Sequence, residues 1–217
     1  QFLLSKNDMC TLNILPQIIK SGIKALKIEG RMKTPEYVAI VVKIYRKYID
    51  LYYSRPDKYS VDYEDSLKIR QIFSRELGTG YYEGDVEDIV DPEKSGSIGN
   101  LAGRIKRITT GKKNKKASIV IAGKIDIRRG DILEIWTKKG NKRLKIKEVE
   151  SRERGGRYEH TVEVESGRPY SPKDRAFKYF DRKLDGEAKA LFLYDRPGAP
   201  KSGNTVKGIH PVSSLKD

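Results

Sequence analysis

Histidine and cysteine are scarce in this chain of 217 residues. The single cysteine, Cys10, excludes an internal disulfide bond and a metal cage built from cysteine alone. The two histidines, His160 and His210, lie far apart in sequence, so we predict no metal site and no Ser/His/Asp or Cys/His catalytic group. We expect His160 to be a packed or surface residue of a strand rather than a catalytic base.

Long apolar runs are also missing. Runs such as residues 38–42 and 119–122 cannot span a bilayer, which requires about 20 apolar residues. No signal-peptide pattern opens the chain. We therefore predict a cytoplasmic protein with no membrane partner. The chain starts at Gln1 inside an apolar stretch rather than at Met, and we expect it to be a piece of a longer protein.

Charged residues are plentiful but unevenly distributed. The chain has 45 Lys and Arg against 30 Asp and Glu, a formal net charge of +15. Residues 1–95 hold 15 of each sign, whereas residues 96–217 hold 30 basic and 15 acidic residues. The whole excess lies in the second half, which makes a polyanion such as RNA the first candidate partner. The alternative is a solubilising surface.

Residues 1–56 show the pattern of an α/β segment. The spacing predicts a helix over residues 8–21 with Pro16 in its early part, a strand over residues 25–28, and a second helix that starts at Thr34. Strand–helix–strand order implies parallel strands, which need cover on both faces. We therefore predict the incomplete end of a larger α/β domain.

From about residue 97 the pattern changes to short strands separated by turns, which is typical of an antiparallel barrel or sandwich. The predicted fold is α+β and multidomain. Residues 1–95 form the incomplete α/β region with following helices, residues 96–192 form the strand-rich domain with a terminal helix, and residues 193–217 form an extended or disordered tail. The predicted strands cover residues 100–108, 117–122, 132–137, 143–149, 158–165 and 176–179.

Three charged residues, Lys27, Glu29 and Arg31, alternate at the end of the predicted strand over residues 25–28, and so they point the same way. The carboxyl ends of strands are where α/β barrels place their active sites. Lys27 and Arg31 would bind a substrate anion, and Glu29 would orient the substrate or exchange a proton. The alternative is an ion-paired strand end. Cys10 is a reactive thiol, a ligand to a metal cluster in the complete protein, or a buried small residue.

Basic clusters fall mostly in the predicted turns of the second domain. Several such turns at one end of a barrel would form a positive rim that contacts phosphates without reading base sequence. Few aromatic residues lie among the clusters, apart from Trp136 and Tyr158, so base stacking on a sheet face is not favoured. The alternative is a set of solvated turns. The predicted RNA-binding residues are Lys112, Lys113, Lys115, Lys116, Arg128, Arg129, Lys138 and Lys139.

Four stretches together resemble the collagenase-like peptidase family U32. They read Asp-Met-Cys-Thr-Leu at residues 8–12, Leu-Lys-Ile-Glu-Gly-Arg-Met-Lys at 26–33, Pro-Glu-Tyr-Val at 35–38 and Tyr-Arg-Lys-Tyr-Ile-Asp at 45–50. Their order and spacing match the family, and the second stretch is its most specific marker. The resemblance covers residues 3–90 well and residues 96–192 more loosely.

The resemblance implies that the first region is the end of a TIM-like α/β barrel. It implies that the second is a β-barrel similar to the second domain of translation factors. It also implies two activities, a protease and an enzyme that hydroxylates a pyrimidine in tRNA or ribosomal RNA with a cysteine-bound iron–sulfur cluster and a prephenate-derived donor. No motif here matches the cluster cysteines, so we expect no cofactor in this chain and an iron–sulfur cluster only in a longer parent.

We predict that the chain is the C-terminal part of an RNA-hydroxylating enzyme and is inactive by itself. The barrel would bind RNA, and Lys27, Glu29 and Arg31 would line the rim of the parent's active site. One alternative is a collagenase-like protease acting on a protein substrate. Another is a module that binds a protein or the ribosome without catalysis.

Overall fold

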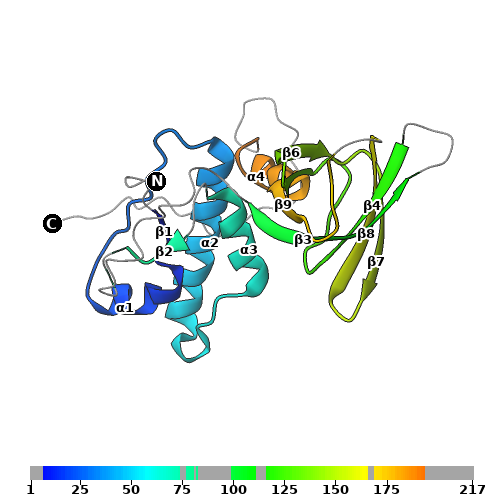
Figure 1. The fold of residues 1–217 in the computed structure, drawn as a ribbon. Helices are drawn as coiled ribbons and strands as arrows, with labels where there is room; N and C mark the ends of the chain where they lie inside the picture. Colours follow the sequence, from blue (N-terminus) through cyan, green and yellow to red (C-terminus); the bar gives the residue numbers. More distant parts are fainter. Residues whose placement is uncertain are drawn as a thin grey trace.

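Helices and sheet occupy opposite sides of the computed structural model (Figure 1). The structure describes residues 7–73, 77–80, 82, 99–110, 116–165 and 169–193. The predicted tail, apart from Leu193, lies outside the described residues. The described elements confirm a chain that combines helices with an antiparallel sheet.

Three short elements replace the helix predicted over residues 8–21. They are β1 (Asp8–Met9), the 3-10 turn η1 (Leu12–Ile14) and α1 (Leu15–Lys20). Pro16 explains the difference, because proline has no N–H to donate and is tolerated only in the first turn of a helix, where it lies in α1. β1 pairs in parallel with β2 (Leu77–Gly78), so the segment that follows the helices lies beside the segment that precedes them.

The long helix α2 (Pro35–Ser54) begins where the sequence predicts. The Thr34 hydroxyl accepts a hydrogen bond from the Tyr37 amide at 3.3 Å, and Pro35 occupies the first turn. Its apolar side is buried against η1, α1, the short turn η2 (Pro56–Lys58) and α3 (Tyr63–Ile72). Asp65 of α3 joins this packing, since its carboxylate accepts a hydrogen bond from the Tyr48 hydroxyl at 3.0 Å.

The strand predicted over residues 25–28 is wrong: these residues have no regular secondary structure. A parallel strand needs a neighbouring strand to satisfy its backbone groups, and within the described residues the only parallel pair is β1 with β2. The TIM-like arrangement is thus not confirmed. One apolar side of this segment remains accessible, with Ile23 45% and Leu26 40% exposed.

Seven antiparallel strands form the sheet, in the order β6-β5-β9-β3-β4-β8-β7. Most lie where the sequence predicts, although the single strand predicted over residues 143–149 divides into β6 and β7. The strands are β3 (Asn100–Thr110), β4 (Lys116–Gly123), β5 (Ile132–Thr137), β6 (Gly140–Lys145), β7 (Val149–Arg154), β8 (Arg157–Glu165) and β9 (Arg175–Phe180).

The sheet curves around one apolar core but does not close, so the predicted barrel is wrong. In the described residues β6 and β7 are the two edge strands and do not pair with each other. Just after β6, Ile146 exchanges backbone hydrogen bonds with Gly130 and Asp131 at 2.8 and 2.9 Å, which continues the pairing of this segment towards the start of β5. Charged side chains, including Lys145 and Glu163, line the opening.

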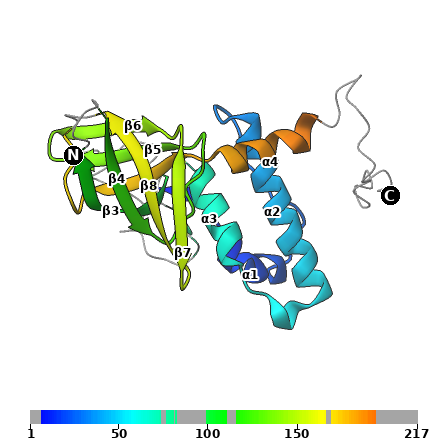
Figure 2. The same cartoon turned by 90° about the vertical axis from the view of Figure 1, so that its right-hand side faces the viewer.

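Helix α4 (Arg182–Leu193) follows the last strand and joins the two parts. Its Leu184 and Ala188 are buried in the same core as α2 and α3, and Figure 2 shows α4 crossing beside α2. At its start, buried Lys178 lies 3.0 Å from both the Asp131 and Asp181 carboxylates. The Asp131 carboxylate also accepts the Arg182 amide at 2.9 Å, so the turn before β5 holds the first turn of α4.

Candidate functional site

Lys27, Glu29 and Arg31 lie in the irregular segment between α1 and α2. Lys27 Nζ is 3.5 Å from Glu29 Oε2, and the two side chains are 87% and 68% exposed. Glu29 Oε1 accepts the Arg31 amide at 2.9 Å. That hydrogen bond, followed by the charge of Lys27, lowers the pKa of Glu29. Lys27 and Glu29 are thus paired through their side chains, whereas Arg31 meets Glu29 through its backbone amide, and in this exposed setting Glu29 is an ionised surface carboxylate.

A second ion pair, which sequence analysis missed, lies behind this segment. Lys33 Nζ is 3.4 Å from Asp8 Oδ2, and both side chains are less than one-third exposed. The same ammonium lies 5.1 Å from the centre of the Tyr37 ring. Lys33 is the last residue of the marker stretch at residues 26–33, and Asp8 is the first residue of the stretch at residues 8–12. That both belong to stretches that resemble the family was the only sequence signal for this pair.

Cys10 lies beside Asp8 and is half-buried. The Tyr45 hydroxyl lies 3.9 Å from Cys10 Sγ, towards which it donates, and accepts the Thr11 amide at 3.0 Å. Burial raises the pKa of Tyr45 to about 12, so the hydroxyl keeps its proton at neutral pH. The cluster of Asp8, Lys33, Cys10 and Tyr45 can therefore present one carboxylate, one ammonium and one thiol to a polar ligand.

Lys138 and Lys139 are exposed in the two-residue turn between β5 and β6. The backbone of this turn is fixed internally: Thr137 Oγ1 donates to the Gly140 carbonyl at 2.7 Å, and Gly140 has a φ of +95°. Both lysine side chains are accordingly available to a ligand. The predicted sites Lys112, Lys113 and Lys115 lie outside the described residues, and Lys116 is the first residue of β4.

Arg128 and Arg129 lie at the other end of β5, before its first residue. The strand has six residues, about 20 Å at 3.3 Å per residue, so these arginines and the lysine turn do not form one rim. Arg128 Nε is 2.6 Å from Asp126 Oδ2, a hydrogen bond that raises the pKa of Arg128. Arg129 is exposed. The structure therefore separates the predicted RNA-binding residues into at least two groups.

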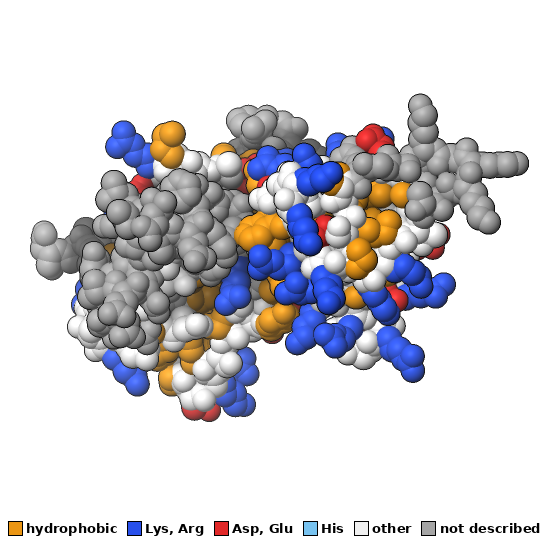
Figure 3. Space-filling view, in the orientation of Figure 1, with side chains coloured by type: hydrophobic (Ala, Val, Ile, Leu, Met, Phe, Trp, Pro, Cys, Tyr) orange, Lys and Arg blue, Asp and Glu red, His pale blue; other side chains and the backbone are white. Residues whose placement is uncertain are grey.

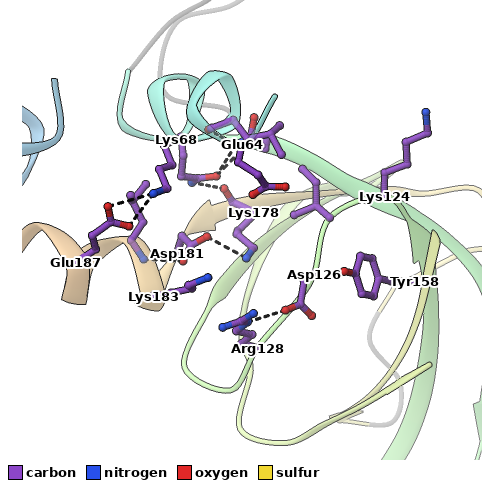
Figure 4. A pocket seen from close by; sticks show the side chains of 15 residues that line it. Glu64, Lys68, Lys124, Asp126, Arg128, Tyr158, Lys178, Asp181, Lys183 and Glu187 are labelled. Carbon is purple, nitrogen blue, oxygen red and sulfur yellow. Dashed lines mark hydrogen bonds and ion pairs between the residues drawn. The ribbon is translucent and has the colours of Figure 1, made fainter. Parts of the chain in front are cut away.

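A cleft of about 190 Å³ lies where α3, α4 and the loop before β5 meet (Figure 4). Its charged side chains largely pair with one another. Glu187 lies 2.9 Å from both Lys43 and Lys68, and Lys178 contacts Asp131 and Asp181. Because these charges pair with one another, the cleft is an ion-paired contact between the helices and the sheet. It does not favour a ligand of either sign of charge.

His160 is buried, which agrees with the prediction of a packed strand residue and not with that of a surface residue. Its Nδ1 lies 2.8 Å from Ser151 Oγ, and its Nε2 lies 3.1 Å from the Ile125 carbonyl and 3.3 Å from the Ile127 amide. Desolvation lowers the pKa of His160. Within the described residues, no group of three or more His, Cys, Asp or Glu could hold a metal ion. No helix in the same residues is long and apolar enough to cross a membrane.

Comparison with known proteins identifies the first part of the chain. Residues 1–91 match the sequence model of peptidase family U32. Over 83 residues, the chain is 39% identical to tRNA hydroxylation protein P1 of Bacillus subtilis, which covers 38% of this chain and 20% of that protein. It is also 32% identical over 85 residues to a protein named collagenase from Porphyromonas gingivalis, which covers 39% of this chain and 23% of that protein.

A longer alignment exists with tRNA hydroxylation protein P of Escherichia coli. The two are 26% identical over 157 residues, which covers 69% of this chain and 32% of that protein. No solved structure matches the chain. The first 91 residues thus match peptidase family U32, and the chain aligns with between about a fifth and a third of the length of these relatives.

Proposed function

We propose that this chain is the C-terminal part of a peptidase family U32 enzyme that hydroxylates a pyrimidine in RNA, and that its sheet region binds the RNA. One observation carries the proposal. The alignment with the Escherichia coli tRNA hydroxylation protein covers 69% of the chain, so it must extend well past residue 91 into the sheet. The alignment with the Porphyromonas gingivalis collagenase covers only 39%.

The charge of the sheet region supports RNA as the partner. The net charge of +15 belongs to residues 96–217, and Lys and Arg side chains gather over the sheet side of the molecule in Figure 3. RNA-binding proteins neutralise phosphates with such side chains, and the release of counterions makes their affinity fall with salt. The proposed phosphate contacts include Lys138, Lys139 and Arg129, which are exposed.

The helical region supports a place in a larger α/β domain. A groove lined by Ile23, Leu26, Val42 and Tyr53 leaves apolar side chains 40–71% exposed beside α2. We propose that further strands and helices of a TIM-like barrel cover this groove in the longer enzyme, because exposed apolar surface of this extent is otherwise unfavourable. Lys27, Glu29 and Arg31 would then stand at the rim of the barrel's active site.

An iron–sulfur cluster does not fit this chain. Such clusters are held by about four cysteine thiolates, and the chain has one cysteine, which is half-buried next to the Tyr45 hydroxyl. Other parts of a longer enzyme would have to supply the cluster. The contribution proposed for this chain is therefore RNA binding in the sheet region and polar contacts from Lys27, Glu29 and Arg31.

Binding of total tRNA to the 217-residue chain, followed from about 50 to about 300 mM salt, tests the proposal. Four or more phosphate contacts give a slope of log affinity against log salt of about −3 or steeper. The double substitution Lys138→Gln/Lys139→Gln should lower the steepness by about 1. Lys20→Gln/Lys24→Gln removes the same charge from exposed positions of the helical region and serves as the matched control. Absence of binding at the lowest salt would refute the RNA role.

A protease is the second candidate, since relatives named collagenase are 31–32% identical to this chain over 85 residues. The test is cleavage of a collagen-type substrate by the longer enzyme and by its Glu29→Ala variant. Cleavage that the variant loses would favour the protease, whereas hydroxylated RNA produced by the same enzyme would favour the first proposal.

A further inference from the structure

Charge is distributed unequally within the sheet itself. The four strands β6, β5, β9 and β3, which are consecutive in the sheet, contain eight Lys and Arg and a single acid, Glu134. The two strands at the other edge, β8 and β7, contain three Arg and five Glu. The excess positive charge of the described strands therefore lies mainly in the half of the sheet that runs from edge strand β6 to β3.

The outward surface of these four strands carries arginines against aromatic rings. Arg175 of β9 lies over Trp136 of β5, with its guanidinium carbon 4.8 Å from the ring centre. The Trp136 and Phe177 rings are 4.6 Å apart. Arg143 of β6 lies over Tyr179 of β9, with its guanidinium carbon 3.8 Å from the ring centre. We call these five residues, with Arg104 and Glu134, the arginine–aromatic face, although Phe177 itself is buried.

Hydrogen bonds hold this face in place. Glu134 accepts from Trp136 Nε1 at 3.2 Å and from Arg143 Nε at 3.2 Å. The Glu134 side chain is 13% exposed, whereas that of Arg143 is 58% exposed. The acid is thus the inner support of the face, and the guanidinium groups form its outer surface. Such fixed guanidinium planes lose little freedom when a ligand stacks on them.

Two arginines of this face lie opposite each other on neighbouring strands, and an anion between them would be stabilising. Arg104 of β3 and Arg175 of β9 are direct cross-strand partners, and both are exposed. Like charges in this position destabilise a sheet. A phosphate between them would reverse the sign of that interaction, because each arginine can donate two hydrogen bonds to it.

We propose that the arginine–aromatic face binds an unpaired stretch of RNA. Bases stack on the guanidinium planes of Arg175 and Arg143, which their aromatic partners support from below, and phosphates contact Arg104. Single-stranded RNA is recognised in this way because its bases are free to stack on aromatic and guanidinium planes, whereas the bases of a duplex are not. The inference rests on the proposed function and names the surface and the form of RNA.

Trp136 makes the test direct, since it is the only tryptophan in the chain. The 217-residue protein is titrated at low salt with a single-stranded 12-nucleotide RNA of mixed sequence and, separately, with the same sequence as a duplex. Single-stranded RNA should change the Trp136 fluorescence in a saturable way. The duplex, which binds through phosphates alone, should change it much less at equal occupancy measured by fluorescence anisotropy of a label on the RNA.

The variant Arg175→Lys separates stacking from charge, because lysine keeps the positive charge and removes the planar guanidinium. It should weaken single-stranded binding about tenfold and leave duplex binding within about twofold. Arg154→Lys is the matched control: Arg154 is exposed at the end of β7, which is the last strand at the other edge of the sheet order and contributes no residue to this face, and the change should alter neither affinity.

Failure of this inference differs from failure of the proposed function. If neither RNA binds at low salt, both are refuted. If both RNAs bind with a steep salt dependence while the Trp136 fluorescence stays constant, the RNA role stands and this face is excluded. The comparison of the two RNAs on the unaltered protein holds even if Arg175→Lys fails to fold.

Discussion

The helical and sheet regions differ in what they leave exposed. Among the described residues, nine of the eleven exposed large hydrophobic side chains belong to residues 9–82, with Met32 96% exposed. The sheet encloses its own apolar core and exposes mostly charged side chains. The sheet therefore resembles a complete folding unit. The helical region has two apolar surfaces: α4 packs on one of them, and the other, the groove beside α2, stays exposed.

The two regions also have separate cores, and the buried residues of α4 belong to the helical one. Each therefore needs its own probe of unfolding. Trp136 lies in the sheet and reports its unfolding by fluorescence, while the far-ultraviolet circular dichroism of α2 and α3 reports the helices. We expect two urea transitions, one for each region, and the following substitutions test whether the two regions unfold separately.

Lys178→Met should have the largest effect, because it acts where the regions meet. The Lys178 side chain is 5% exposed, and its loss leaves Asp131 and Asp181 without their shared cation. We expect the free energy of unfolding to fall by about 3 kcal/mol, the usual result of breaking a buried ion pair. Both transitions should move to lower urea, since Asp131 belongs to the sheet side and Asp181 caps α4.

Lys183→Met is the control for Lys178→Met, because Lys183 is exposed on α4 and its substitution should change stability by no more than about 0.5 kcal/mol. A shift of the fluorescence transition alone in Lys178→Met would show that the helical core does not depend on this junction.

Acid should weaken the sheet before the helices. The pKa of His160 is lowered below its ordinary value of 6.5 by burial, so the unfolded chain takes up a proton first as the pH falls. The stabilisation is complete above about pH 6.5 and is lost on acidification towards the folded-state pKa, by at most about 1.4 kcal/mol per pH unit. The check is the urea midpoint of Trp136 fluorescence between about pH 7.5 and about pH 5.5.

The variant His160→Gln isolates this effect, because glutamine does not titrate. Its midpoint should be lower at neutral pH and should depend less on pH in this range. An equal pH dependence in the variant and the unaltered protein would assign the acid sensitivity to other groups.

Thr34→Ala should have the smallest effect and should act on the helices. The substitution removes the hydrogen bond from the Tyr37 amide at the start of α2, which costs about 1 kcal/mol. The circular dichroism transition should move while the fluorescence transition stays. Thr34→Ser keeps the hydroxyl and should retain most of the stability, so an equal loss in both variants would rule out the cap as the cause.

Local patterns predicted the elements whose stability is local. Thr34 and Pro35 fixed the start of α2, and turns such as Lys138-Lys139-Gly140 separated the strands correctly. Predictions from the sequence failed where the structure of a segment depends on a partner that is distant in the sequence. Residues 25–28 have the composition of a strand but pair with no strand among the described residues, and the edge strands β6 and β7 do not pair with each other.

The candidate sites show the same limit. The spacing of Lys27, Glu29 and Arg31 predicted that their charged groups lie together on a strand. The segment is not a strand, Lys27 and Glu29 form an ion pair, and Arg31 contacts Glu29 through its backbone amide. The ion pair of Asp8 with Lys33 joins residues 25 positions apart, and the arginine–aromatic face joins residues of four strands. No spacing in the sequence encodes either, because both depend on how the chain folds back on itself.

The role of α4 in completing the helical core has a consequence during synthesis. A ribosome releases α3 about 110 residues before it releases the start of α4, a delay of roughly 5 to 20 s at ordinary elongation rates. Throughout that time the surface of α2 and α3 that Leu184 and Ala188 later cover faces water. The helices made first are therefore the part of this chain that most needs a chaperone, because all seven strands of the sheet are synthesised before α4 can cover them.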